Sequence, residues 1–296
     1  MNHKLLFLLL SILLVAGCSS EGRRLKTESG YEYEIVRKGS ETPIAVNDYI
    51  FFNMSLTADD SLLQSTASMG KPSVLKLTED TKNYGQLKPL IDLMATLHEG
   101  DSLLFYFPLD SLDTRPPAFD SLKGPLIYHV GIKDIMNEAE FEVHADSIQQ
   151  EQEAVRKIVR DRLPEVEKFT KATYDAYKKG ELTAQMQTTS SGLRYIIHEQ
   201  GDGPRPSQGD QVSVHYYGML DSDATMFDSS FKGGQPYQFP VGTAQVVRGW
   251  DEAVLLMNKG TKATLFIPAS LAWGAAGSPP LIPENADVIF YIEIEK

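Results

Sequence analysis

The most regular pattern along the chain is an alternation of apolar and polar residues over short runs. Val212, Val214 and Tyr216 form one such run, and residues 290–294 contain another. Successive side chains of a β-strand point to opposite faces, so a period of two predicts half-buried antiparallel strands. Turn-forming sequences, such as Gly-Asp-Gly-Pro at 201–204, separate these runs.

A helical pattern lies between these strands. It is indicated by apolar residues at helical spacing, namely Trp250, Val254, Leu255 and Met257. The acidic residues 251–252 suit the positive end of the helix dipole. One short helix with strands on both sides predicts a curled antiparallel sheet wrapped over that helix.

The same order of segments occurs twice. With a shift of 162 residues, 47–50 aligns with 209–212, and with a shift of 160 residues, 93–100 aligns with 253–260. Few residues are identical, but order and spacing hold over ~100 residues, as expected for a repeated unit. We therefore predict an internal duplication, and the fold class of both halves is α+β.

Between the halves, residues 137–188 are rich in Glu, Gln, Lys, Arg and Ala. An amphipathic helical segment is predicted by apolar residues at helical spacing, which are Val155, Val159, Val166, Phe169 and Tyr177. Proline disrupts a helix interior, so Pro164 predicts a kink or two helices. This helical linker is either a spacer packed on its own domains, or an element for homodimer formation or client contact.

Composition narrows the class of protein. The 296 residues provide room for about two domains. The formal net charge of −12 argues against nucleic acid as a partner, because nucleic-acid binding requires basic patches. Six histidines show no spacing typical of a metal site, and we expect neither a metal ion nor a cofactor.

The N-terminus has the pattern of a secretory leader. His3 and Lys4 precede an apolar run at 5–15 that is too short for a comfortable membrane span. Val-Ala-Gly-Cys at 15–18 resembles the lipobox of bacterial lipoproteins, which implies cleavage before Cys18 and lipidation of its thiol.

The leader pattern predicts a signal peptide at 1–17, and the polar and charged residues that follow predict a tether at 18–29. Because Ser19 is not the aspartate that retains some lipoproteins in the inner membrane, the lipobox resemblance also implies a lipid anchor in the outer membrane, facing the periplasm. The alternative is a soluble periplasmic protein that is cut nearby. Cys18 is the only cysteine, so its lipidation leaves none for a disulfide.

Aromatic and aliphatic residues gather at predicted strand ends and loops of the second half. They are Tyr216, Phe227, Tyr237, Phe239, Val246, Val247, Trp250, Trp273, Leu281, Ile282 and Phe290, with Asp228 as the main polar residue among them. Taken singly, each aromatic residue is explained by core packing. The order of five short motifs is more specific, and these motifs lie at 215–218, 227–230, 247–250, 272–274 and 281–283.

These motifs closely resemble the FKBP-type peptidyl-prolyl cis–trans isomerases over about residues 192–296. The resemblance implies a half-barrel of antiparallel strands around one short helix, with Trp250 as the floor of an apolar proline pocket. The catalytic residues that it implies are Tyr216, Phe227, Asp228, Trp250, Trp273 and Phe290. The substrate-binding residues that it implies are Tyr237, Phe239, Val246, Val247, Leu281 and Ile282.

An apolar pocket of this kind suits the isomerisation of X–Pro bonds. The barrier is ~18–20 kcal/mol because twisting destroys amide resonance. The twisted amide is less polar than the planar one, so an apolar site favours it without a nucleophile, metal or general base. We therefore expect an isomerase that assists the folding of exported proteins, with proline-containing unfolded or nascent polypeptides as its substrates. The alternatives are a non-catalytic periplasmic chaperone or binding module for unfolded envelope proteins, and a structural envelope subunit.

Three positions depart from the usual family pattern. Trp273 replaces a tyrosine whose hydroxyl bonds a substrate carbonyl, Gly233 replaces an arginine that often pairs with the rim aspartate, and Ser278 replaces a histidine. We expect isomerase activity at 189–296 in spite of them.

The first half lacks the pocket pattern. Leu90 aligns with Trp250, Met54 with Tyr216, and Leu63-Gln64 with Phe227-Asp228, so that only Tyr128 remains of the aromatic set. Residues 30–136 are therefore expected to form a degenerate FKBP-like domain without isomerase activity. Client binding, dimerisation and spacing from the membrane remain open as its role.

Overall fold

The computed structural model describes residues 24–66, 70–79, 81–112 and 114–296. The predicted signal peptide, Cys18 with its lipidation and the first part of the tether lie outside these residues. The chain divides into two compact units, Met1–Asp146 and Ser147–Lys296. Within the described ranges, no helix combines the length and the apolar composition that a membrane span requires.

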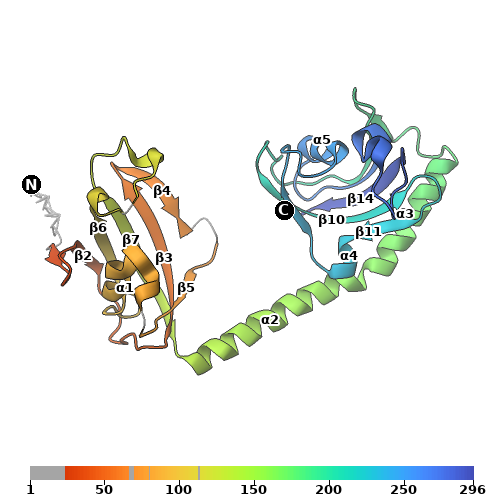
Figure 1. Cartoon of the computed structure of the whole chain (residues 1–296). Coiled ribbons are helices and arrows are strands. Elements are labelled where there is room, and N and C mark those ends of the chain that lie inside the picture. Colours follow the sequence, from red (N-terminus) through yellow and green to blue (C-terminus); the bar gives the residue numbers. More distant parts are fainter. Residues whose placement is uncertain (1–23, 67–69, 80, 113) are drawn as a thin grey trace, which may run out of the picture. The chain divides into compact units, whose positions relative to one another are not determined.

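The described part of the N-terminal unit contains a seven-stranded antiparallel sheet with a short α-helix packed on it (Figure 1). Its strands are β1 (Leu25–Lys26), β2 (Glu32–Arg37), β3 (Tyr49–Ala58), β4 (Ser61–Ser65), β5 (Ser73–Lys76), β6 (Ser102–Phe107) and β7 (Leu126–Met136). Its helices are η2 (Thr81–Leu87), α1 (Lys88–Met94), η3 (Leu109–Ser111) and η4 (Pro117–Phe119). Helix α1 buries Leu90 and Ile91 against the strands.

The expected tether at 18–29 is wrong for its C-terminal residues. Leu25 and Lys26 form β1, which pairs with β2 in antiparallel register. The preceding Arg24 donates hydrogen bonds to Glu32 and Glu34. The charged composition of this stretch, which suggested a solvated tether, instead supplies ion pairs along the edge of the sheet.

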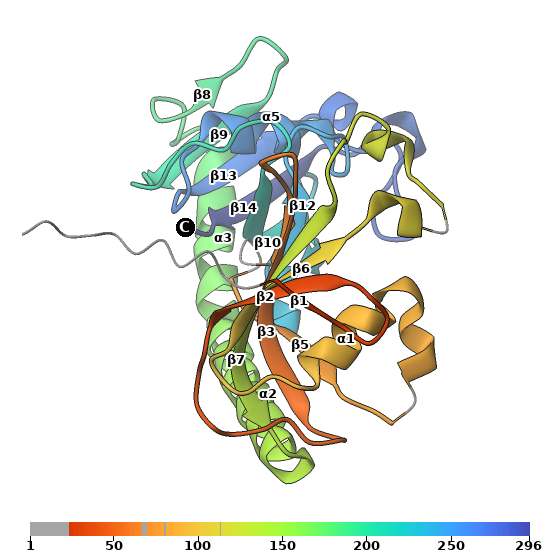
Figure 2. The same cartoon turned by 90° about the vertical axis from the view of Figure 1, so that its left-hand side faces the viewer.

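The described part of the C-terminal unit contains a second seven-stranded antiparallel sheet. Its strands are β8 (Gln187–Thr188), β9 (Arg194–Glu199), β10 (Gln211–Leu220), β11 (Met226–Ser229), β12 (Tyr237–Pro240), β13 (Lys262–Ile267) and β14 (Val288–Ile294). Its helices after the linker are α4 (Ser230–Gly233), α5 (Arg248–Leu256), η5 (Ala269–Leu271) and η6 (Gly274–Ala276). The expected helix at Trp250 is α5, which lies over one face of this sheet (Figure 2).

The two sheets have the same strand order. It is β1-β2-β6-β7-β3-β4 in one and β8-β9-β13-β14-β10-β11 in the other, with β5 pairing β3 and β12 pairing β10. The cross-strand register also corresponds, because Tyr128 lies opposite Leu56 and Phe105, as Phe290 lies opposite Gly218 and Leu265. A shared order and register is what an internal duplication requires.

The linker contains two helices, α2 (Glu138–Asp161) and α3 (Leu163–Lys178). Pro164 lies in the first turn of α3, where its missing N–H costs no helical hydrogen bond. Gly180 follows the end of α3 with a φ of 75°, a left-handed conformation that favours glycine. Residues 187–188, which we expected in the helical linker, belong to β8 in the sheet instead.

Helix α3 covers the face of the C-terminal sheet opposite α5. Its Val166 and Tyr174 are buried in a cluster with Tyr217, Phe266 and Ile289. Of the stripe predicted in the linker, Val159 and Tyr177 also pack against this cluster, whereas Val155 and Phe169 remain exposed. The linker is therefore in part a structural layer of the C-terminal unit.

A polar network joins the start of α3 to the sheet. Arg162 donates a hydrogen bond to Glu293 at 2.5 Å, and the Tyr291 hydroxyl donates to the same carboxylate at 2.8 Å. This bond to Glu293 raises the pKa of Arg162, and burial together with the Glu293 charge raises the pKa of Tyr291. A buried carboxylate is thus paired and hydrogen-bonded, as its desolvation requires.

Candidate active site

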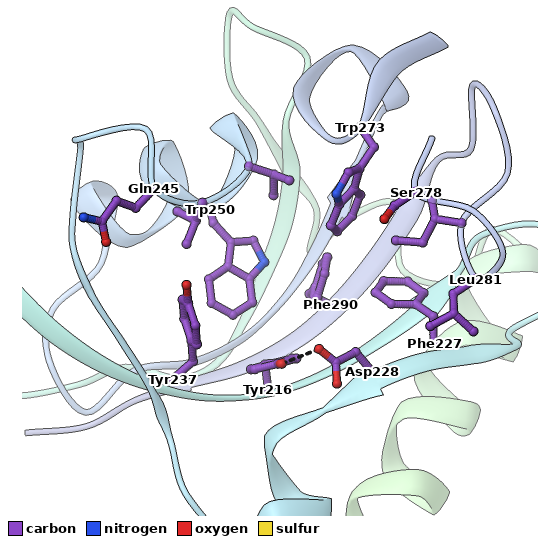
Figure 3. A pocket seen from close by; sticks show the side chains of 13 residues that line it. Tyr216, Phe227, Asp228, Tyr237, Gln245, Trp250, Trp273, Ser278, Leu281 and Phe290 are labelled. Carbon is purple, nitrogen blue, oxygen red and sulfur yellow. Dashed lines mark hydrogen bonds between the residues drawn. The ribbon is translucent and has the colours of Figure 1, made fainter. Parts of the chain in front are cut away.

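The C-terminal unit contains a cavity of about 590 Å³ between its sheet, α5 and the β13–β14 connection (Figure 3). The lining residues are Tyr216, Phe227, Asp228, Tyr237, Gln245, Val246, Val247, Trp250, Trp273, Ser278, Leu281, Ile282 and Phe290. A mainly aromatic and aliphatic wall with a few polar groups is typical of a site for a small apolar ligand group.

Strands, a helix and a connection position these side chains. Strands carry Tyr216 on β10, Phe227 on β11 and Phe290 on β14, so their rings are held by the hydrogen-bonded ladder of the sheet. Helix α5 carries Trp250, and the β13–β14 connection carries Trp273. Sites built on regular elements hold their geometry more closely than sites built on loops alone.

Gly249 allows α5 to approach the sheet. A Cβ atom at this position would lie 2.6 Å from the side chain of Ile267 on β13, closer than packed carbon atoms approach. Its absence lets the first turn of α5 pack directly on the strand and sets the depth of Trp250, which is 4% exposed.

Phe290 lies at the centre of the aromatic cluster. Its ring is 5.2 Å from Trp250 and 5.4 Å from Phe227, in edge-to-face arrangements, and 6.1 Å from Tyr216. Trp273 approaches from above and meets Phe227 edge-to-face at 5.9 Å (Figure 3). Such aromatic contacts stabilise the folded state by more than their buried area alone accounts for, so the cluster forms a rigid apolar wall.

The indole of Trp250 has a buried donor. Its Nε1 has no hydrogen-bond partner among the described residues. The ring edge that carries Nε1 faces Phe290 (Figure 3), so the N–H points at an aromatic ring rather than at an oxygen. The floor of the cavity therefore offers no strong polar interaction to a bound group.

The rim carries a hydrogen-bonded pair. The Tyr216 hydroxyl donates to Asp228 Oδ2 at 2.5 Å, and the Ser229 backbone N–H donates to Asp228 Oδ1 at 2.8 Å. Burial of Tyr216 raises the pKa of its hydroxyl, and the bond to the Asp228 carboxylate raises it further. The phenol therefore stays protonated at neutral pH and holds the carboxylate in place.

The backbone N–H of Val247 is a candidate hydrogen-bond donor at the cavity wall. Val247 precedes α5, and its N–H makes no backbone hydrogen bond to any residue that the structure describes. Because Val247 also lines the cavity, this N–H is available to a carbonyl oxygen of a bound peptide.

Of the twelve predicted site residues, the structure brings all but Phe239 to the cavity wall. Phe239 is fully buried and lies behind that wall, 5.8 Å from both Trp250 and Tyr237. Tyr237 and Phe239 share one face of β12, and the pattern of a strand does not tell which of two such residues reaches the cavity.

Sequence reasoning missed Gln245 and Ser278, which also line the cavity. Gln245 directly precedes the predicted Val246 and Val247, and its position next to them was the available signal. Ser278 was noted only as a departure from the family pattern. Neither side chain belongs to an aromatic motif, so the motifs did not identify them.

Gly218 shapes the cavity without lining it. A Cβ atom here would lie 2.7 Å from the Phe290 ring and 2.8 Å from the Phe227 ring. The absence of a side chain on β10 therefore makes room for both rings. The N-terminal unit has Leu56 at the corresponding register position, where it is buried in the core.

In the N-terminal unit, residues that correspond to the cavity wall or its surroundings are packed in the core. Leu90, Leu56 and Tyr128 belong to one buried cluster there. Leu112 and Phe119, from the connection between β6 and β7, pack against it.

Comparison with known proteins agrees with this geometry. Residues 203–295 match the sequence model of the FKBP-type peptidyl-prolyl cis-trans isomerases. FK506-binding protein 1 of Candida glabrata is 41% identical over 111 residues, which are 37% of this chain and 96% of that protein. The chain therefore belongs to the family of FKBP-type peptidyl-prolyl cis–trans isomerases.

Among individual relatives, the chain is similar to the probable FKBP-type peptidyl-prolyl cis-trans isomerase FkpA of Neisseria meningitidis. The two are 37% identical over 156 residues, which are 50% of this chain and 56% of that protein. The chain thus spans little more than half of this relative. A solved crystal structure of AtFKBP13 is 34% identical and covers 36% of this chain and 94% of its own, with a TM-score of 0.35.

Proposed function

We propose that this protein is a peptidyl-prolyl cis–trans isomerase that acts on proline-containing polypeptides through its C-terminal unit. The observation that carries the proposal is the aromatic cavity with Trp250 as its floor. Family membership supports the same reaction.

The cavity suits the transition state of the reaction. A proline ring packs on the apolar floor, and the Val247 N–H donates to a peptide carbonyl, which leaves the X–Pro bond among apolar walls. The planar amide is stabilised by charge separation, and this separation is lost as the bond twists. An apolar wall therefore stabilises the twisted form relative to the planar form, and this difference is what accelerates the reaction.

Trp273 takes the place of the family's usual tyrosine at the roof of the cavity. Its indole offers an N–H donor and a flat apolar surface. The ring lines the cavity and meets Phe227 in an edge-to-face arrangement. We propose that Trp273 contacts the substrate mainly through this apolar surface.

The proposal is tested by measuring cis-to-trans relaxation of a proline-containing peptide with the full chain. Trp250→Leu should lower kcat/KM by about ten- to a hundredfold, which corresponds to ~1.4–2.7 kcal/mol of transition-state stabilisation. Leucine is chosen because Leu90 occupies the corresponding place in the N-terminal unit, where it packs well. Trp273→Ala, at a half-buried position, provides a second variant that spares the core.

Phe169→Ala is the matched control, because it removes an aromatic ring of α3 from the face away from the cavity. Equal kcat/KM in the wild-type chain, Trp250→Leu and Trp273→Ala would contradict the proposal. Peptide binding without acceleration of the cis-to-trans relaxation would instead identify a non-catalytic binding module.

The same variants test the N-terminal unit. We propose that it is a degenerate FKBP-like domain without isomerase activity, because Leu56 and Leu90 stand at the positions of Gly218 and Trp250 and are buried in its core. If the N-terminal unit is inactive, adding a substitution there, such as Tyr128→Ala, should not lower the residual kcat/KM of Trp250→Leu.

We further propose that the protein acts in the cell envelope on exported polypeptides, anchored by lipid at Cys18 to the outer membrane. The leader pattern and the lipobox-like sequence support this proposal. Cys18→Ser should move the protein from the membrane fraction to the soluble fraction. An unchanged distribution, or a mature N-terminus without an attached lipid by mass spectrometry, would contradict it.

A further inference from the structure

Among the described residues that line the cavity, only Asp228 carries a charge. Its two oxygens accept hydrogen bonds from the Tyr216 hydroxyl and the Ser229 backbone N–H, and neither donor is cationic. The side chain is exposed at the rim. Within the part of the chain that the structure describes, Asp228 forms no salt bridge.

Three other carboxylates of the C-terminal unit are each paired with a cation. Asp221 pairs with Lys178 at 2.8 Å, Asp202 pairs with Lys296 at 2.8 Å, and Glu293 is held by a guanidinium. The negative charge of Asp228 is thus fixed in place by two neutral donors and remains uncompensated beside an apolar cavity. Apolar walls screen a charge less than water does, so its field extends over the cavity mouth.

The side chains around this carboxylate also suit a cation. Tyr216, Phe227 and the 44% exposed Tyr237 present aromatic rings at the same cavity. An ammonium or guanidinium group is attracted to aromatic faces within about 6 Å. The aliphatic stem of a lysine or arginine packs on apolar surface while its charged end stays in water.

We infer that the cavity prefers peptides with Lys or Arg adjacent to the proline, and that Asp228 is the specificity-determining residue. This inference rests on the proposed isomerase function and names its substrate class. The expected preference is about two- to fivefold, the range for one exposed ion pair.

The test compares peptides that differ in one residue, placed either directly before or directly after the proline. Lysine is compared with Nε-acetyl-lysine, which has a similar stem but no charge. The full chain is assayed for kcat/KM in isomerisation and, separately, for Kd by calorimetry. At one of the two positions, lysine should be preferred about two- to fivefold at low salt, and the ratio should approach one at 1 M salt, where the Debye length is about 3 Å.

Two variants assign the preference to its source. Asp228→Asn keeps an oxygen that can accept a hydrogen bond from the Tyr216 hydroxyl but removes the charge, so the lysine preference should disappear. Glu181→Gln removes one negative charge from an exposed residue of the same unit that does not line the cavity, so the preference should persist.

Equal kcat/KM and equal Kd for the lysine and acetyl-lysine peptides at both positions would overturn the inference. A preference that survives in Asp228→Asn would overturn it as well, because the charge would then act from elsewhere. A lysine preference in Kd that depends on Asp228, without any acceleration, would support this inference and contradict the proposed isomerase function.

Discussion

Gly218 shows how one residue without a side chain creates the space of a binding site. It lies directly opposite Phe290 in the β10–β14 ladder, and the rings of Phe290 and Phe227 occupy the volume that a side chain there would take. Leu56 holds the same register position opposite Tyr128 in the N-terminal sheet. A glycine in a strand weakens it, so its presence here is explained by the close approach of the two rings.

Gly218→Ala should therefore displace both rings. A Cβ at 2.7–2.8 Å from them requires movement of the cavity wall, which should cost about 1–3 kcal/mol of unfolding free energy. Peptide affinity should fall in parallel, as measured by calorimetry, while urea denaturation reports the stability. Gly233→Ala is the control, because a Cβ there meets nothing within 4 Å. Equal stability and affinity of both variants would contradict the assigned role.

Helix α3 explains a difference between the two sheets. On the face away from α5, the C-terminal sheet carries Tyr217 and Tyr291 as opposite partners, and α3 covers them. The corresponding partners in the N-terminal sheet are Ser55 and His129, which are polar. The apolar face requires a cover, and α3 supplies it from the same chain.

Val166→Ala in α3 should lower the unfolding free energy of the C-terminal unit by about 1–3 kcal/mol, because this side chain is 6% exposed and its removal leaves a cavity. Val155→Ala in α2 makes the same chemical change at a 55% exposed position and should alter stability by no more than about 0.5 kcal/mol. Urea denaturation measures both. Similar losses in the two variants would show that α3 is no more integral to the unit than α2.

The role of α3 also bears on how much chain the activity requires. The family match begins at residue 203, after α3 has ended. A fragment that starts there would expose Tyr217, Met219 and Ile289 to water. The unit to which we assign the proposed isomerase activity therefore includes α3, and the assay is best made on the full chain.

Within the described residues, the same strand order occurs twice, but the side chains beside the short helix differ between the two units. Each unit has its own buried cluster between its sheet and a short helix. In the C-terminal unit, the space beside this helix is an aromatic cavity, and in the N-terminal unit residues that correspond to the cavity wall or its surroundings are packed in the core. The aromatic wall therefore assigns the proposed chemistry to the C-terminal unit.

Much of this organisation was predictable from the order of residues. Strand alternation at 212–216 and helical spacing from Trp250 are local patterns, and both elements are present where expected. The effect of Pro164 was also predictable, because proline acts on the backbone of its own turn. The family resemblance identified eleven of the cavity residues, because motifs in a fixed order align the chain with a fold whose site residues are already known.

The sequence by itself thus determined the class of fold, the repeated order of elements and most of the aromatic wall, because periodicity and motifs depend on neighbours along the chain. The tertiary structure decided that Phe239 lies behind the wall, that Gly218 makes room for two rings and that residues 25–26 join the sheet. It also decided that α3 covers the second face of the C-terminal sheet. These features depend on which residues meet across strands far apart in the chain, and burial and register arise only when those strands are brought together.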